Sequence, residues 1–183
     1  MNKKVDLANY NNKGYHPGNK FITILWFFFN VFVIKNNLNP FSSYRIFVLK
    51  LFGAKIGNGV IIRPGVSVKY PWKLQIGDNS WIGENVWIDN LSNIIIGKNV
   101  CVSQGAMLLS GNHNYKKTSF DLISKEIIID NGSWVGAKSI VCGGVKLESH
   151  CVLSVGSVAS SDLQSYGIYK GNPAKKIRER IIK

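Results

Sequence analysis

The chain has 183 residues and a mass of 20.4 kDa, which is the size of a single domain with short appendages. Apolar residues make up 45% and charged residues 18%, and this composition excludes a disordered chain. A net charge of +13, from 23 Lys and Arg against 10 Asp and Glu, predicts affinity for an anionic partner. The candidates are phosphorylated cofactors, acidic polysaccharide, anionic lipid and nucleic acid.

The cysteine count and the N-terminus bear on the cellular compartment. The three cysteines, Cys101, Cys142 and Cys151, include no CxxC pair, so neither a disulfide framework nor a structural zinc site is expected. The N-terminus lacks an apolar segment directly after its lysines and a small-residue cleavage site, so no secretory signal is predicted. We therefore expect a reducing, cytoplasmic location.

Residues 1–55 are expected to form a helical N-terminal unit. Within it, the stretch 21–34 (FITILWFFFNVFVI) is apolar nearly all round, but its 14 residues fall short of the roughly 20 needed to cross a bilayer. An amphipathic helix is predicted to begin at Ser42 or Ser43 and to end at Gly53. Its apolar face holds Tyr44, Phe47, Val48 and Leu51.

Two interpretations of this N-terminal unit remain open. A solenoid needs its open end covered, which favours a cap over the repeat that follows. The alternative is contact with a membrane surface, at the inner face of the cytoplasmic membrane. The basic residues that would assist such a contact are Lys20, Lys35, Arg45 and Lys50.

From Ile56 onward, an aliphatic residue recurs every six positions. The fifteen positions form five triplets: Ile56-Ile62-Val68, Ile76-Ile82-Ile88, Ile96-Val102-Leu108, Ile129-Val135-Val141 and Leu147-Leu153-Ala159. Four residues after each aliphatic, twelve of the fifteen slots hold Val, Ser, Ala or Cys. A period of six is neither the alternation of an ordinary strand nor a helical period. We therefore predict an all-β fold, in which three hexads close one triangular coil of a parallel β-helix, with about five coils stacked about 4.8 Å apart.

Glycine often follows the aliphatic position of the hexad. The examples are Gly57, Gly77, Gly83, Gly97 and Gly136. Because glycine takes positive φ without steric cost, these residues are predicted to form the tight corners of the coil.

Three interruptions of the repeat follow the third member of a triplet. The step lengthens to eight residues after Val68 and after Ile88, and to twenty-one after Leu108. All three insertions therefore leave the prism at the same corner. The repeat domain at 56–163 thus carries a long loop at 109–128, and loops on a rigid scaffold often carry function.

Residues 164–183 leave the repeat. Pro173 interrupts the chain there, and four basic residues follow, namely Lys175, Lys176, Arg178 and Arg180. We expect a short, basic, helical tail, which is either simply solvated or in contact with phosphate groups.

His113, at the start of the long loop, is the candidate catalytic residue. It breaks the inward pattern of the coil, and histidine is the side chain whose ordinary pKa suits a general base near neutral pH. Asn90 lies in one of the eight-residue steps and is expected at the same corner, one coil away. A histidine that takes a proton and an amide that orients a hydroxyl would make an acyl-transfer pair.

Several segments together resemble the hexapeptide-repeat acyltransferases, whose fold is a left-handed β-helix. They are the hexads of pattern [LIV]-G-x-x-[STAV]-x, the loop 111–115 (GNHNY) and the segment 171–175 (GNPAK). Two more, 51–57 (LFGAKIG) and 86–91 (VWIDNL), resemble the colanic-acid and exopolysaccharide O-acetyltransferase group. The resemblance covers residues 51–180 well and 1–50 loosely.

The resemblance implies an acetyl-CoA-dependent, metal-free enzyme that works as a homotrimer with active sites between subunits. His113 would remove the proton from the acceptor hydroxyl as that hydroxyl attacks the thioester. Asn90 would bind the acceptor, and Trp134 would lie near the thioester. The implied CoA contacts are Ala137, Val155, Gly156, Ser160, Lys175 and Arg178, the last two at the nucleotide phosphates.

The implied acceptor is a sugar hydroxyl, free or on a lipid-linked oligosaccharide, in exopolysaccharide, capsule or lipopolysaccharide biosynthesis. An antibiotic or an amino acid as acceptor is an alternative, and so is a non-enzymatic scaffold with the same fold. A metal-dependent hydratase is not expected, because the histidine spacing does not suit a three-histidine site. Nucleic acid is not expected either, because the basic residues concentrate at the two ends, eight in 1–55 and six in 170–183.

Overall fold

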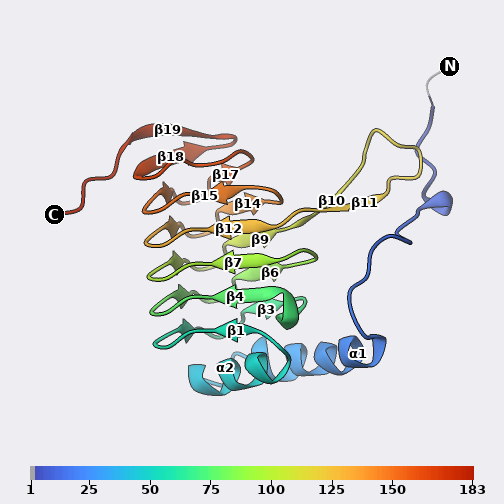
Figure 1. Cartoon of the computed structure of the whole chain (residues 1–183), viewed down its shortest axis with the longest axis horizontal. Helices are drawn as coiled ribbons and strands as arrows, with labels where there is room; N and C mark the ends of the chain where they lie inside the picture. Colours follow the sequence, from blue (N-terminus) through green and yellow to red (C-terminus); the bar gives the residue numbers. More distant parts are fainter. Residues whose placement is uncertain (1–2) are drawn as a thin grey trace.

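The computed structural model describes residues 3–183 and shows three parallel sheets wrapped around one core (Figure 1). The first face of this prism consists of β1 (Lys55–Ile56), β4 (Leu74–Ile76), β7 (Ile94–Ile96), β12 (Ile127–Ile129) and β15 (Lys146–Leu147). The second consists of β2 (Ile61–Ile62), β5 (Trp81–Ile82), β8 (Cys101–Val102), β13 (Trp134–Val135) and β16 (Val152–Leu153), extended by β18 (Gly167–Gly171) and β19 (Ala174–Glu179). The third consists of β3 (Ser67–Val68), β6 (Trp87–Asp89), β9 (Met107–Leu109), β14 (Ile140–Cys142) and β17 (Val158–Ala159).

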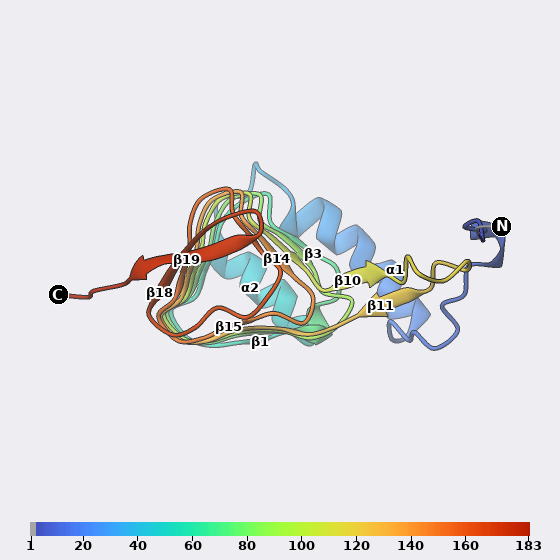
Figure 2. The same ribbon diagram turned by 90° about the horizontal axis from the view of Figure 1, so that it is seen from above.

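The three faces give the molecule a triangular outline when it is seen from above (Figure 2). Each coil contributes one strand to each face, and strands in successive coils pair in parallel, as in Ile62↔Ile82. Five coils are complete. A sixth begins at Leu163, which is bridged to Leu147, and it ends in β18, which pairs with β16. The predicted parallel β-helix is therefore confirmed, with one partial coil more than expected.

Two corners of the prism matter for function. The second corner joins the second face to the third, and the loop corner joins the third face to the first. The three predicted insertions do leave at the loop corner. A 3-10 turn, η3 (Pro71–Lys73), fills the first one, and the antiparallel hairpin β10 (Gly111–His113) and β11 (Leu122–Ser124) projects from the last one (Figures 1 and 2).

The hexad repeat forms the core. All fifteen aliphatic positions are buried, and none is more than 8% exposed. The small residues four positions after each aliphatic residue fill the corners, where buried hydroxyls bond to the backbone. Ser80 Oγ, for example, donates to the carbonyl of Gly97 in the next coil at 2.7 Å. These bonds satisfy polar groups that would otherwise be costly to bury.

The glycines after the aliphatic residues have a different role from the one expected. None of the five has positive φ; the left-handed corner residues are others, such as Asn85 and Gly156. A Cβ on Gly83 would lie 2.7 Å from the backbone nitrogen of Gln104 in the next coil. Glycine is therefore required there by the close approach of stacked backbones, not by the corner conformation.

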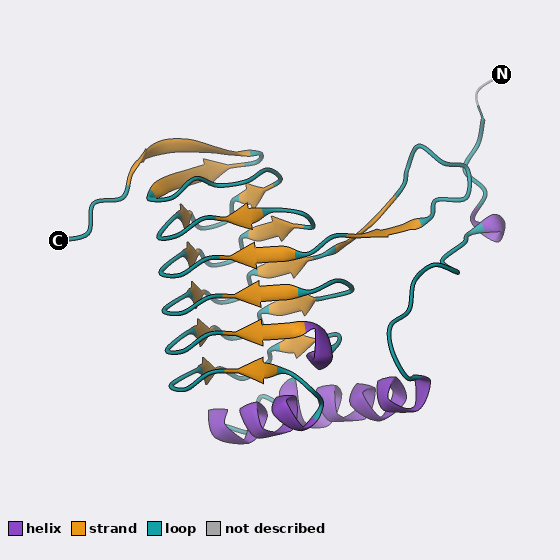
Figure 3. Cartoon of the chain, in the orientation of Figure 1, coloured by secondary structure: helices purple, strands orange, loops and turns teal. Residues whose placement is uncertain are grey.

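Two helices lie across the open end of the first coil (Figure 3). They are α1 (Lys20–Phe29), which continues into one π-helical turn, η2 (Asn30–Ile34), and α2 (Ser42–Leu51); a short 3-10 turn, η1 (Leu7–Asn9), precedes them. The indole of Trp26 is buried and donates to the Val68 carbonyl at 2.9 Å. Val48 and Leu49 of α2 are also buried. The helices thus cap the core, and no helix among the described residues is long and apolar enough to span a membrane.

The expected apolar face of α2 is divided in the structure. Val48 packs inward, whereas Tyr44, Phe47 and Leu51 are exposed. Arg45, expected among the membrane-facing basic residues, is fully buried and donates to the carbonyls of Asn36, Asn39 and Ile62. Burial lowers the pKa of its guanidinium, whose role is to hold the turn before α2 against the solenoid.

The C-terminal segment is a β-hairpin and not the expected helical tail. β18 continues the second face, and β19 pairs antiparallel with it through Lys170↔Lys175. Arg180 fastens the end of the hairpin by donating to the carbonyls of Gly132 and His150. The open edge of the second face accounts for the difference, because pairing with it satisfies backbone groups that a helix would leave unpaired.

Candidate active site

His113 lies on β10, in the hairpin that projects from the loop corner. Its ring stacks on Phe120, with 4.5 Å between centroids and 9° between planes, and its Nδ1 lies 3.0 Å from the Phe120 carbonyl oxygen. A carbonyl can only accept, so Nδ1 carries the proton and Nε2 of the neutral ring holds the free electron pair. The loop therefore holds the imidazole in one orientation, and the role of His113 as general base stays a prediction.

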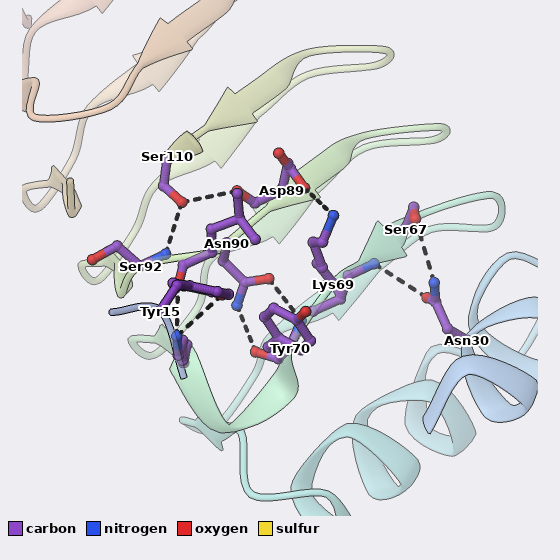
Figure 4. A network of polar contacts seen from close by, with 12 residues as sticks. Tyr15, Asn30, Ser67, Lys69, Tyr70, Asp89, Asn90, Ser92 and Ser110 are labelled. Carbon is purple, nitrogen blue, oxygen red and sulfur yellow. Dashed lines mark hydrogen bonds and ion pairs between the residues drawn. The ribbon is translucent and has the colours of Figure 1, made fainter. Parts of the chain in front are cut away.

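Asn90 lies at the loop corner, as expected, but it does not face an acceptor. The side chain is fully buried, Nδ2 donates to the Tyr70 carbonyl at 2.6 Å, and Oδ1 accepts from the Tyr70 amide at 2.9 Å (Figure 4). Both polar ends of the amide are thus used within the chain. These bonds indicate that Asn90 holds the corner, and contact of Asn90 with the acceptor stays a prediction.

The carboxylate next to Asn90 is the one that reaches the surface. Asp89 pairs with Lys69 at 3.3 Å (Figure 4). A Cβ placed on Gly111 would lie 3.6 Å from Asp89 Oδ2. Gly111 begins the strand that carries His113 two residues later. Asp89 therefore lies beside the base of the His113 hairpin, and the sequence analysis did not single it out.

Asp89 and Lys69 belong to a pocket of about 290 Å³ between α1 and the third face. It is lined by Thr23, Trp26, Phe27, Asn30, Ser67, Lys69, Tyr70, Trp87 and Asp89. The indole of Trp87 is 45% exposed and forms an apolar wall. An aromatic surface with a few convergent polar groups is the usual construction of a small-molecule site.

An N-terminal strap, residues 3–18, runs along the loop corner to the His113 hairpin (Figure 1). The amide of Asp6 donates to Thr118 at 2.8 Å, and the ring of Tyr10 lies 5.9 Å from that of His113. Tyr15 donates to the carbonyl of Leu91 at 2.9 Å. The sequence showed no sign of this contact, because nothing in an irregular polar segment predicts where it packs.

Lys73 helps to hold the strap at this corner. Its ammonium donates to the same Leu91 carbonyl at 2.6 Å and lies 4.7 Å from the centre of the Tyr15 ring. Burial lowers the pKa of the Lys73 ammonium, and burial also raises the pKa of the Tyr15 hydroxyl, so the phenol remains a protonated donor.

The residues expected to contact CoA lie elsewhere on the prism. Trp134 is on β13 of the second face, 46% exposed, and its indole donates to Ser103 Oγ at 2.8 Å. Ala137, Val155 and Gly156 lie together at the second corner, where Val155 is 68% exposed. Nothing lies within 4 Å of a Cβ placed on Gly156, so the backbone is open there.

The remaining expected CoA contacts are exposed. Ser160 follows β17 at the loop corner, and Lys175 and Arg178 are on β19. Neither Lys175 nor Arg178 pairs with a carboxylate of the described chain, whereas Lys176 pairs with Glu179 at 2.6 Å. The structure thus groups Ala137, Val155 and Gly156, and it separates this group from His113.

Two of the three cysteines, Cys142 and Cys151, are poor candidates for a nucleophile. Burial raises the pKa of the Cys151 thiol to about 11 and also raises that of Cys142, so both remain protonated near neutral pH. No group of three or more His, Cys, Asp or Glu side chains in residues 3–183 is placed to hold a metal ion.

Comparisons with known proteins identify the family of the chain. No family model matches the chain. The colanic acid biosynthesis acetyltransferase WcaF of Escherichia coli is 34% identical over 169 residues, which cover 92% of this chain and 93% of that protein. The galactoside O-acetyltransferase of Escherichia coli is 26% identical over 135 residues, which cover 72% of this chain and 66% of that protein.

Solved structures share the fold. A hexapeptide-repeat acetyltransferase from Vibrio cholerae, complexed with acetyl coenzyme A, has a TM-score of 0.82 at 19% identity over 96% of each chain. A galactoside acetyltransferase in complex with coenzyme A has a TM-score of 0.75 at 20% identity, covering 87% of this chain and 80% of that one.

The parallel β-solenoid and these relatives place the chain in one class of enzyme, the acetyltransferases. The chain belongs to the hexapeptide-repeat acetyltransferase family, in the group of the colanic acid biosynthesis acetyltransferase WcaF. It is an acetyltransferase, and acetyl-CoA is its co-substrate.

Proposed function

We propose that this enzyme transfers the acetyl group to a sugar hydroxyl in exopolysaccharide, capsule or lipopolysaccharide biosynthesis, in one direct step with His113 as general base. The observation that carries this proposal is the bond between His113 Nδ1 and the Phe120 carbonyl, which leaves Nε2 free to accept a proton. The 34% identity with WcaF, whose name refers to colanic acid biosynthesis, supports a saccharide acceptor.

In the proposed reaction, the acceptor oxygen attacks the acetyl carbonyl carbon while its proton passes to His113 Nε2. The carbon–sulfur bond then breaks, and the histidine returns the proton to the CoA thiolate, so the base is regenerated. General-base catalysis contributes about 10²–10⁴-fold to such a step. Holding both substrates in one cleft contributes further, because the reaction becomes effectively unimolecular.

We place the acceptor in the pocket that contains Asp89 and Trp87. The indole of Trp87 offers a flat apolar surface for the C–H face of a sugar ring, and the carboxylate of Asp89 offers an acceptor for its hydroxyls. The pocket adjoins the base of the His113 hairpin, so a hydroxyl of a bound sugar can point toward Nε2.

We further propose a homotrimer with active sites between subunits. In one chain, one side of the prism separates the second corner from the loop corner, and its hexad spans at most roughly 20 Å. His113 therefore does not meet the CoA group of Ala137, Val155 and Gly156 in the same chain. A second copy whose second corner faces this loop corner would complete the site, and a closed ring repeats that contact with no unpaired surface.

The direct test is a panel of acceptors assayed by release of free CoA thiol. Galactosides, other free sugars and nucleotide-linked sugars should include at least one acceptor that raises thiol release well above the rate in water. Serine and chloramphenicol serve as non-sugar controls. Transfer to either of these, with none to any saccharide, would overturn the sugar assignment.

The basic residues of β19 are expected to bind the phosphates of CoA. Changing Lys175→Ala together with Arg178→Ala should weaken acetyl-CoA binding by roughly tenfold or more at low salt, because two charge-assisted bonds are lost. Calorimetric titration at low and high salt measures this, and the difference should shrink as salt rises. Lys176→Ala is the matched control, since Lys176 already pairs with Glu179. If the affinity for acetyl-CoA is unchanged in the double variant, β19 is not part of the cofactor site.

Asp89 is expected to act on the acceptor and not on the cofactor. Asp89→Asn should raise the KM of the sugar identified by the panel by roughly 10- to 100-fold, through loss of one charged hydrogen bond of about 1.5–3 kcal/mol. The Kd of acetyl-CoA should stay within twofold. Asp130→Asn, at another partly buried aspartate that pairs with a lysine, is the control. An equal change in both variants would mean that the effect is general electrostatics.

We also propose that the enzyme works at the inner face of the cytoplasmic membrane, where lipid-linked oligosaccharides would be accessible to it. The physical basis for lipid contact lies in the helical end of the solenoid.

A further inference from the structure

The outer side of α1 is apolar and uncovered. The helix is apolar nearly all round, and such a helix is normally buried on every side. Its inner stripe packs on the solenoid through Trp26 and Phe29. On the opposite stripe, Phe21 is 73% exposed and Phe28 is 51% exposed, and Phe32 of the π-helical turn is 67% exposed.

α2 and the turn before it extend this surface. Because both helices pack their buried stripes on the first coil, their exposed stripes point away from the solenoid (Figure 3). We call the combined surface the helical face. Its exposed apolar side chains are Phe21, Ile24, Leu25, Phe27, Phe28, Val31, Phe32, Leu38, Phe41, Tyr44, Phe47 and Leu51. An apolar groove of about 560 Å³, lined in part by Leu25, Leu51 and Phe52, adjoins it. Patches of this extent on soluble chains mark sites of contact.

The charge around the helical face has one sign. Between Asp6 and Asp78 the sequence contains no Asp or Glu but nine Lys and Arg. Lys20, Lys35 and Lys50 belong to or border the two helices and are exposed, and none of them pairs with a carboxylate within residues 3–183. Aromatic residues with lysines at their edges match a surface that is apolar beneath a layer of negative charge.

We propose that the helical face docks on the surface of an anionic phospholipid bilayer, with α1, the π-helical turn and α2 lying in the interface. The same face of a second copy is a poor occupant, because it would bring these lysines against their own copies. In a cyclic trimer, three helical faces lie on the same side and bind with avidity; only this avidity rests on the trimer of the proposed function.

Docking in this orientation sets the height of the active site. The His113 hairpin leaves the solenoid after the third coil, so it stands roughly 20 Å above the lipid surface, from coil spacings of about 4.8 Å and one helix diameter. The acceptor pocket opens beside α1 at the same corner. A saccharide carried on a lipid could therefore reach the pocket without leaving the membrane surface.

The test is vesicle co-sedimentation of the full chain. The wild type should bind vesicles of phosphatidylcholine with about one third phosphatidylglycerol, and bind pure phosphatidylcholine far more weakly. The double variant Phe28→Glu, Phe32→Glu should lower binding at least tenfold. Lys20→Gln with Lys35→Gln should lower binding to anionic vesicles roughly 30-fold, at about 1 kcal/mol per lysine, with little effect on neutral ones. Ile181→Glu with Ile182→Glu, exposed residues at the other end, is the charge-matched control.

Two outcomes would overturn the proposal. One is absence of vesicle binding by the wild type together with a doubled particle mass that Phe28→Glu, Phe32→Glu reverses, which would assign the face to a second copy. The other is equal loss of binding in the control variant, which would mean that net charge alone drives association. Acetyl-CoA titration of the same samples reports separately on the proposed enzyme function.

Discussion

Replacing His113 by alanine is expected to lower the kcat of acetyl transfer by about 10²–10⁴-fold while leaving the Kd of acetyl-CoA within about twofold. The reason is the position of the side chain. His113 lies on the loop-corner hairpin, whereas the residues expected to hold CoA lie at the second corner and on β19. Removing the imidazole therefore removes a proton acceptor without removing a CoA contact.

The measurement combines thiol-release kinetics on the acceptor found in the panel with calorimetric titration of acetyl-CoA. His16→Ala is the matched control, because His16 is an exposed histidine in the strap. It should retain kcat within severalfold. A variant of His113 that loses cofactor affinity, or that unfolds near the assay temperature, would show that its stacking on Phe120 is structural and that the base must be sought elsewhere.

The sequence predicts the scaffold well because every coil repeats the same physical requirement. An inward aliphatic such as Ile82 and a small inward residue such as Val86 must recur in each hexad, or the coil cannot close around its core. Insertion points follow from the same count, since extra residues after Val68, Ile88 and Leu108 can only leave at one corner. The sheet pairing of the C-terminal tail depends on a free strand edge instead, and the repeat does not encode that edge.

The active site is predicted less completely, and Asp89 and Asn90 show why. Adjacent side chains on a strand point to opposite faces. Because Ile88 points into the core, Asp89 should point out and Asn90 back in, and the structure shows this arrangement. Selection by chemistry favours the buried amide of Asn90, whereas alternation along the strand favours the outward-pointing carboxylate of Asp89.

Contacts between segments that are distant in the sequence are a second feature that the sequence does not predict. Tyr10 lies beside His113 only because α1 crosses the first coil and directs the strap up the loop corner (Figure 1). That path depends on the packing of Trp26 and Trp72, whose indoles bond to Val68 and Pro17. A single sequence gives no periodic signal for such a path.

Asn90→Ala is expected to destabilise the fold by about 3 kcal/mol, from two buried backbone groups of Tyr70 left without partners at about 1–3 kcal/mol each. For a chain of this size, that lowers Tm by roughly 6–12 °C. Thermal unfolding monitored by circular dichroism measures the change. Asn58→Ala, at an exposed asparagine whose side chain has no bond within the described chain, should change stability by no more than about 0.5 kcal/mol.

The same variant separates a structural amide from a catalytic one. If Asn90 only holds Tyr70, then Asn90→Ala assayed well below its Tm keeps acetyl-CoA affinity and most of its kcat, because His113 is on β10 and the Asp89 side chain points away from the core. A variant with wild-type Tm but a kcat lowered a hundredfold would show that Asn90 acts on the acceptor. Asn90→Asp sharpens the contrast, since it keeps the oxygen that accepts from the Tyr70 amide but places a buried charge against the Tyr70 carbonyl. Its Tm should fall at least as far as that of the alanine variant, because an unpaired buried charge costs more than a missing amide.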